Sequence, residues 1–171
     1  MNYYFSGEIN KDSVCDLINF LNDHPEHVTI YLSSYGGDHH RTDVLIDIIN
    51  NRSDKTKLIA INYIESSAFR LFFSVKCEKE IKDLTYGCFH QPYQDFTLSS
   101  TGLIYDEEEK YKKKRLKKIF QQVLLWAQSI GMNEKEIGKF TAGKDIYFSH
   151  GRLVELLQKQ KNKPMFEDDI L

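Results

Sequence analysis

Apolar positions in the first 90 residues follow two different spacings. Short runs rich in aromatic or β-branched residues predict strands at Tyr3–Phe5, Val28–Leu32, Leu58–Ile61 and Gly87–Phe89. Between these runs, apolar residues at helical spacing predict helices around Val14–Leu21, Val44–Ile49 and Ser66–Phe73. Asp12 or Ser13 is the expected cap of the first helix. Because strands that alternate with helices usually pair in parallel, the pattern predicts an α/β fold.

The second half of the chain contains one long predicted helix, from about Asp106 to Ile130. Its apolar positions share one helical face: Leu116, Ile119, Phe120, Val123, Leu124, Ala127 and Ile130. Leu125 and Trp126 widen this apolar surface, and Gly131 is the expected end of the helix. Asn133 and Glu136 fit a capping box, Ser149 is the expected cap of a last helix, and the tail at about 161–171 is expected to be loose.

Composition narrows the classes of protein. A length of 171 residues suits a single domain. The 23 basic and 25 acidic residues leave a net charge of −2, which does not favour nucleic-acid binding. Three cysteines without a C-x-x-C pair favour neither disulfides nor zinc and indicate a reducing, cytoplasmic setting. No apolar run approaches the ~20 residues of a membrane helix, so we expect no membrane partner. No H-E-x-x-H motif or carboxylate cluster indicates a metal site and nothing indicates an organic cofactor, so we expect neither.

Three features are candidates for chemistry. Gly36 and Gly37 directly follow a predicted strand, where backbone N–H groups could face a ligand or where glycine simply permits the turn. Ser66 and Ser67 precede a predicted helix, so either could cap the helix or act as a nucleophile. His90 ends a predicted strand, and a lone histidine is either structural or a general base.

These features occur in the order found in one protease family. Residues 31–37, YLSSYGG, resemble the I-x-S-P-G-G segment of the Clp protease proteolytic subunit, and residues 64–69, IESSAF, resemble its Q-A-A-S-M-G segment. Residues 87–92, GCFHQP, resemble its R-x-M-I-H-Q-P segment, and residues 143–149, GKDIYFS, its R-D-x-F-M-S-A segment. The resemblance spans about residues 3–156. It implies a ClpP/crotonase-type spiral of β-β-α units with a long helix protruding as a handle.

The resemblance also implies a role for each matching residue. Ser67 would be the nucleophile, His90 the general base and Asp145 the group that orients the imidazole. The amides of Gly37 and Ala68 would form the oxyanion hole. Two adjacent serines leave the register between Ser66 and Ser67 open. The expected activity is serine endopeptidase cleavage of peptides or unfolded protein inside a self-assembled oligomer, with heptameric rings as in the family.

Two other functions stay open at this stage. Tyr35, Tyr63, Glu65, Ser66 and Arg70 are bulkier or more polar than the family's residues, which fits a noncatalytic Clp-like subunit or scaffold. A crotonase-like acyl-CoA enzyme would share the fold class and would use paired backbone N–H groups without a serine. The sequence begins at the first predicted strand, without the family's N-terminal axial segment, so we do not expect a Clp ATPase as partner.

Overall fold

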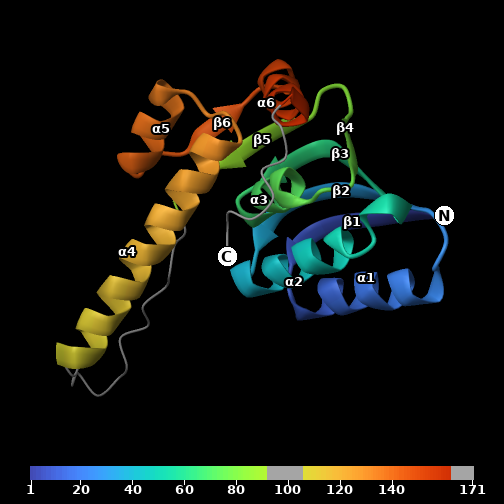
Figure 1. Cartoon of the computed structure of the whole chain (residues 1–171), viewed down its shortest axis with the longest axis horizontal. Coiled ribbons are helices and arrows are strands. Elements are labelled where there is room, and N and C mark those ends of the chain that lie inside the picture. Colours follow the sequence, from blue (N-terminus) through green and yellow to red (C-terminus); the bar gives the residue numbers. More distant parts are fainter. Residues whose placement is uncertain (92–105, 163–171) are drawn as a thin grey trace. The chain divides into compact units, whose positions relative to one another are not determined.

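The computed structural model describes residues 1–91 and 106–162. Its strands are β1 (Asn2–Ile9), β2 (Val28–Gly37), β3 (Thr56–Glu65), β4 (Glu78–Ile81), β5 (Tyr86–Phe89) and β6 (Ile146–Phe148). Its helices are α1 (Lys11–Asp23), α2 (His39–Asn50), α3 (Ser67–Ser74), α4 (Asp106–Ser129), α5 (Glu134–Thr141) and α6 (His150–Asn162), with a 3₁₀ turn η1 at Ser53–Lys55. The α/β prediction is confirmed (Figure 1).

The chain forms two compact units. One contains Met1–Phe89 and the chain from Ile146 onward, and the other contains His90–Asp145. The first unit contains the whole sheet, whereas the second contains α4 and α5. The predicted single domain therefore stays a prediction, and the two units are described one at a time below.

The sheet of the first unit is parallel except at one edge. Strand order is β1-β2-β3-β5-β6, and β4 also pairs with β3. Since β2 occupies one edge of β3, β4 and β5 share the other edge, β4 along residues 57–60 of β3 and β5 along residues 63–65. β6 pairs with β5 in antiparallel orientation, and this pair departs from the expected parallel arrangement.

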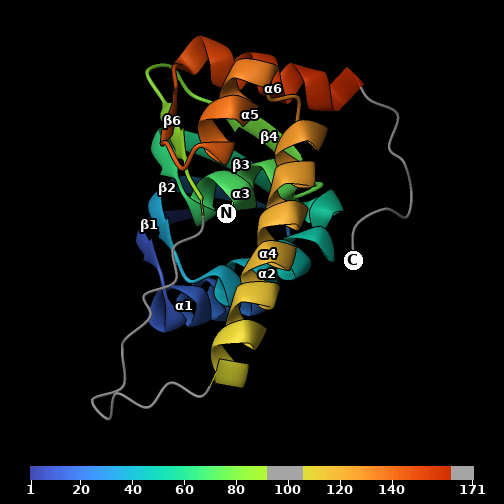
Figure 2. The same ribbon diagram turned by 90° about the vertical axis from the view of Figure 1, so that its left-hand side faces the viewer.

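Helices α1, α2 and α3 follow one another against the sheet. α1 contacts β1 and α2, and α2 contacts α3, which packs on β2 and β3 (Figures 1 and 2). The side chains of Ile9, Leu45, Ile49 and Phe72 are completely buried in this core. Burying such a side chain contributes roughly 1.5–3 kcal/mol relative to leaving it exposed. The packing fixes the ends of β2 and β3, from which the candidate residues project.

The sequence located the helices better than the cap of α1. The cap is Asn10, whose side chain accepts hydrogen bonds from the amides of Asp12 and Ser13, each at 3.0 Å. Ser13 completes a capping box, since its hydroxyl accepts from the Asn10 amide at 3.0 Å. The expectation of Asp12 or Ser13 as cap is therefore wrong, because α1 begins one turn earlier than the apolar periodicity indicates.

The second unit consists of helices that end as the sequence predicts. Gly131 follows α4 at φ 94°, a backbone conformation that glycine adopts without strain. The capping box of α5 is confirmed, because the Asn133 side chain accepts from the Glu136 amide at 2.9 Å and the Glu136 side chain accepts from the Asn133 amide at 2.8 Å. The rings of Phe120 and Phe140 stack at 5.3 Å between centroids, which joins α4 to α5.

The predicted apolar face of α4 is present in the described part of that helix. Ala127 and Ile130 are buried, and Ile119, Val123 and Leu124 are half-buried. Leu125 lies outside this face and is 63% exposed. The side chain of Leu116 and the tail beyond residue 162 lie outside the described residues. None of the helices in the described ranges is both long and apolar enough to cross a lipid bilayer.

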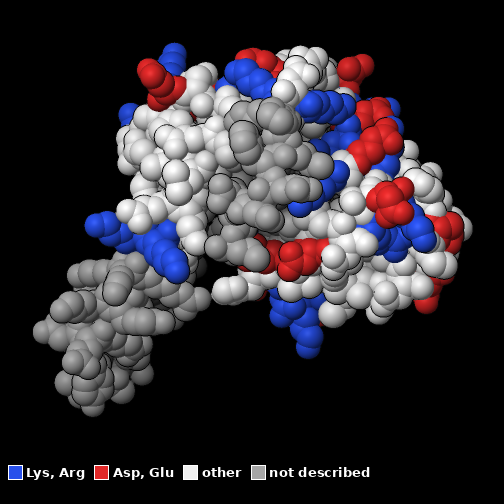
Figure 3. Space-filling view, in the orientation of Figure 1, with Lys and Arg blue, Asp and Glu red and all other residues white. Residues whose placement is uncertain are grey.

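Charged side chains of both signs are intermixed on the sheet-containing unit (Figure 3). Lys57, for example, lies 2.9 Å from carboxylate oxygens of both Glu78 and Glu80. Exposed pairs of this kind contribute little stability, but they prevent a continuous field of one sign. On this face the arrangement agrees with the near-neutral balance of the sequence.

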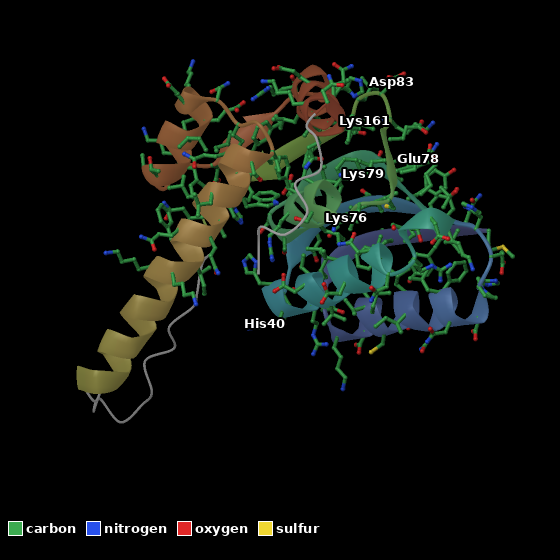
Figure 4. All side chains as sticks on the ribbon, in the orientation of Figure 1. His40, Lys76, Glu78, Lys79, Asp83 and Lys161 are labelled. Carbon is green, nitrogen blue, oxygen red and sulfur yellow. The ribbon has the colours of Figure 1, made fainter. Side chains whose placement is uncertain are left out.

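One lysine of this unit is unusually buried. The Lys79 ammonium group on β4 donates to Gln160 Oε1 of α6 at 3.0 Å, and Gln160 Nε2 donates to the Phe73 carbonyl at 2.7 Å. Burial lowers the pKa of Lys79 to about 8, and the charge of Lys161 adds to the lowering (Figure 4). These bonds connect α6 to β4 and to the C-terminal end of α3, whereas the candidate serines are at its N-terminal end.

Candidate active site

Two glycines at the end of β2 and a conventional helix cap form the turn into α2. Gly36 and Gly37 adopt φ values of 97° and 145°, which side-chain-bearing residues rarely take. Asp38 then caps α2, because its carboxylate accepts from the amides of His40 at 2.8 Å and Arg41 at 3.1 Å (His40 is labelled in Figure 4). These amides hold the pKa of Asp38 below its ordinary value, with a smaller contribution from the Arg41 charge.

Gly36 is also required by close contact with the turn that follows β3. A Cβ atom on Gly36 would lie 2.7 Å from the Ser66 Cβ, 2.8 Å from the Glu65 carbonyl oxygen and 2.9 Å from the Ser67 nitrogen. These atoms leave no room for a side chain, since two of the three belong to the backbone. The conformational explanation of the glycines is therefore incomplete. The Gly36 backbone packs directly against the two serines.

The turn between β3 and α3 has a different construction. Ser66 precedes α3 at φ 52° and ψ −124°, and its side chain makes no capping hydrogen bond to the helix. The expected capping role of this serine is therefore wrong. The Ser66 amide donates to the Cys88 carbonyl of β5 at 2.8 Å, which holds the turn against the neighbouring strand. Such backbone conformations cost about 1–3 kcal/mol in a non-glycine residue and persist only where the surroundings impose them.

Ser67 occupies a completely buried position, one residue into the same turn. Its hydroxyl accepts from the Gly37 amide at 2.8 Å and lies 2.8 Å from the Gly37 carbonyl oxygen, to which it donates. Ala68, the next residue, is also completely buried. The Ser67 side chain thus joins two turns, the serine turn at Ser66–Ser67 and the glycine turn at Gly36–Gly37, through its two hydrogen bonds to Gly37.

An ion pair joins the two helices that follow these turns. Arg70 of α3 pairs with the Asp43 carboxylate of α2. Nearby, burial lowers the pKa of His39, the first residue of α2, and the Arg70 charge lowers it further. Arg70, which departs from the family pattern, therefore has a structural partner in this chain.

His90 and Asp145 lie together in the second unit. His90 follows Phe89 of β5, and Asp145 precedes Ile146 of β6. Phe89 and Ile146 are paired in the sheet. The antiparallel pairing therefore brings the two side chains close, with His90 Nδ1 3.7 Å from Asp145 Oδ1 and side-chain exposures of 29% and 42%. This separation is longer than a hydrogen bond. The neighbouring Gln91 donates to the Phe140 carbonyl of α5 at 2.7 Å.

The structure is similar to many solved protein chains. A point mutant of ClpP1 from Listeria monocytogenes superposes with a TM-score of 0.61 at 20% identity, covering 91% of this chain and 86% of the other. The fold is ClpP-like. No protein-family model matches the sequence, and no curated protein sequence matches it either. The similarity therefore establishes the fold, while the chemistry has to be argued from the residues.

The predicted site residues form two groups, each described within its own unit. Gly37, Ser67 and Ala68 belong to the sheet unit, whereas His90 and Asp145 belong to the helical unit. Sequence reasoning missed two contributors, the Cys88 carbonyl and the close approach of Gly36. A glycine pair after one parallel strand and a serine pair after the next was the available signal, because the carboxyl ends of adjacent parallel strands meet at one edge of the sheet.

Proposed function

We propose that the chain is a serine peptidase that cleaves peptides or unfolded protein segments. The observation that carries this proposal is the contact between the glycine turn and the serine turn, in which a Gly36 Cβ would lie only 2.7 Å from the Ser66 Cβ. Serine hydrolases need a serine hydroxyl beside backbone N–H groups that can stabilise an oxyanion. The ClpP-like fold and the resemblance to the Clp protease proteolytic subunit support the same reaction.

In the proposed reaction, a hydroxyl of the Ser66–Ser67 pair attacks the carbonyl carbon of a peptide bond. His90 accepts the hydroxyl proton as the oxygen–carbon bond forms, and it then delivers that proton to the amine as the carbon–nitrogen bond breaks. Water hydrolyses the resulting ester with His90 again as the base. Asp145, 3.7 Å from His90 Nδ1, would orient the imidazole and stabilise its charged form, in a geometry that tightens on substrate binding. Amides of the glycine and serine turns, Gly37 and Ala68 by the resemblance, would hold the oxyanion.

We also propose that the protein assembles into a homo-oligomeric ring, as the resemblance implies. Leu125 is 63% exposed on α4, next to the half-buried Leu124 and Trp126, and exposed apolar groups of this kind often mark contact surfaces. Light scattering of the purified protein is expected to show an oligomer, and Leu125→Lys to shift it toward smaller species. A monomer at micromolar concentration would contradict the assembly.

The reaction is tested by hydrolysis of fluorogenic peptides. The purified protein is expected to cleave such peptides, and His90→Ala to lower kcat by at least about 10³ because the serine loses its base. His150→Ala is a matched control, since His150 begins α6 outside the proposed triad. Equal rates for the native protein and His90→Ala would contradict the proposal. An acyl-CoA enzyme would bind acyl-CoA instead and would leave the peptides intact.

Replacement of the third residue tests its orienting role. Asp145→Asn keeps the side-chain size but favours the wrong histidine tautomer, and we expect a loss of kcat on the order of 10⁴. Asp83→Asn changes another exposed aspartate as the control. An Asp145→Asn protein with native turnover would show that another group orients His90.

A further inference from the structure

We propose that Ser66, and not Ser67, is the nucleophile of this site. The inference rests on the proposed peptidase function and resolves the register that two adjacent serines leave open. Its basis is the different backbone and side-chain geometry of the two residues.

The backbone of Ser66 is strained at the point where β3 becomes α3. Among the described residues, three non-glycine residues have positive φ, namely Asn62, Ser66 and Leu84. Of these three, Ser66 is the one at a strand-to-helix junction. A sharp, strained strand-to-helix turn is the arrangement by which α/β enzymes present a serine hydroxyl away from the sheet and toward substrate. Strain kept at one residue is characteristic of functional positions.

The strain at Ser66 is imposed by contacts from two other strands. The Cys88 carbonyl of β5 accepts from the Ser66 amide at 2.8 Å, and the Gly36 backbone of β2 leaves no space beside the Ser66 Cβ. These contacts fix the direction of the Cα–Cβ bond. His90 is the second residue after Cys88 in the chain, so the proposed base directly follows the strand that holds the Ser66 amide.

Ser67 has the geometry of a structural residue. It is completely buried, and its hydroxyl is engaged with both the amide and the carbonyl of Gly37 at 2.8 Å. To attack a substrate, this hydroxyl would have to leave both bonds and open the packing between α3 and β2. With the nucleophile at Ser66, the Ser67 hydroxyl instead keeps the glycine turn in place, and the Gly37 amide stays bonded to that hydroxyl and is not a donor to the oxyanion.

With Ser66 in place of Ser67 as the nucleophile, a different backbone amide stabilises the oxyanion. In a strand–serine–helix arrangement, the amide of the residue after the nucleophile is one donor. That donor becomes the Ser67 amide in place of the Ala68 amide. The Ser67 nitrogen lies 2.9 Å from the position that a Gly36 Cβ would take, so this amide and the glycine turn are already neighbours.

Covalent labelling distinguishes the two serines. The purified protein is treated with a fluorophosphonate, whose phosphorus forms a bond to the serine oxygen as fluoride leaves and the serine proton passes to the base. Trypsin then cuts after Lys57 and Arg70, and tandem mass spectrometry locates the adduct within Leu58–Arg70. We expect the adduct on Ser66 in the native protein and in Ser67→Ala.

Two variants complete the test. Ser66→Ala and Ser66→Gly are each expected to lose the adduct, and glycine guards against a folding defect because it adopts positive φ without strain. An adduct on Ser67 in the native protein would overturn the inference and leave the peptidase proposal standing. Absence of any adduct together with absence of peptide hydrolysis would overturn the peptidase proposal and the inference that rests on it.

Discussion

The turns that follow β2 and β3 connect adjacent parallel strands to adjacent helices, yet they are built differently. After β2, glycine takes the positive φ values and the Asp38 carboxylate caps α2. After β3, the positive φ belongs to Ser66, whose side chain does not cap α3. In the first turn, the positive φ values and the helix cap therefore belong to the residue types that usually provide them. In the second turn, a serine has the positive φ and provides no side-chain cap.

This difference shows where local rules stop determining the structure. Natural sequences depart from local preferences mainly where function requires it, and the cost is offset by contacts elsewhere. Here those contacts come from Cys88, Gly36 and the Ser67–Gly37 hydrogen bonds. The glycine turn thus supports the strained serine turn. Substitutions in the two turns are therefore expected to change stability by different amounts.

The largest expected effect on stability comes from adding a methyl group to the conventional turn. Gly36→Ala would place a Cβ 2.8 Å from the Glu65 carbonyl oxygen and 2.9 Å from the Ser67 nitrogen, at a φ of 97°. Backbone atoms cannot move aside cheaply, so we expect a loss of about 3 kcal/mol or more in the free energy of unfolding. Chemical denaturation measures the loss.

Gly138→Ala is the matched control for that substitution. A Cβ on Gly138, within α5, would meet nothing within 4 Å. Alanine is the better helix former by about 1 kcal/mol, so this variant is expected to be slightly more stable than the native protein. Equal stabilities of the two variants would show that the two turns are not tightly packed.

Removing the hydroxyl that joins the turns has the next largest effect. Ser67→Ala deletes the hydrogen bonds to the Gly37 amide and carbonyl inside a buried site. We expect a loss of about 1–3 kcal/mol, because a buried amide is left without its acceptor. Ser66→Ala leaves both of these hydrogen bonds in place and is expected to lose less stability than Ser67→Ala. The opposite order would contradict the structural role of Ser67.

The strain at Ser66 is measured by comparing two substitutions at that position. Glycine usually lowers stability by about 0.5–1 kcal/mol relative to alanine. At φ 52° the order is expected to reverse, so Ser66→Gly should be more stable than Ser66→Ala by about 1 kcal/mol. Thermal unfolding of both variants gives the answer, and the usual order would mean that the turn carries no strain.

The smallest expected effect is a pH dependence of stability that comes from His39, the first residue of α2. Burial, with a smaller contribution from Arg70, lowers the pKa of His39 below 6.5 in the folded protein. The unfolded chain therefore binds more protons near and below pH 6.5, and stability falls as the pH falls through that range. His39→Gln is expected to lose less stability than the native protein between pH 7.5 and pH 5. Parallel pH profiles would contradict the lowered pKa.

The pattern of apolar residues predicted most of the fold, because the main helices bury one face and the main strands contain short apolar runs. It missed β4 and β6, which are short, and three of the four residues of β4 are charged. β6, the antiparallel partner of β5, has three residues and is too short to show a periodicity. The register of the serines was not predictable, since the φ of Ser66 is imposed by Cys88 and Gly36, which lie far from it in the sequence.

The central claim is that Ser66 and His90 act as one catalytic unit, and a double-mutant comparison tests it most directly. Fluorogenic peptide hydrolysis is measured for the native protein, Ser66→Ala, His90→Ala and the double variant. In the proposed mechanism the histidine would act only through the serine, so each single variant is expected to lose at least about 10³ in kcat, and the double variant only a few-fold more. Native-like turnover in Ser66→Ala, or losses that multiply in the double variant, would contradict the account.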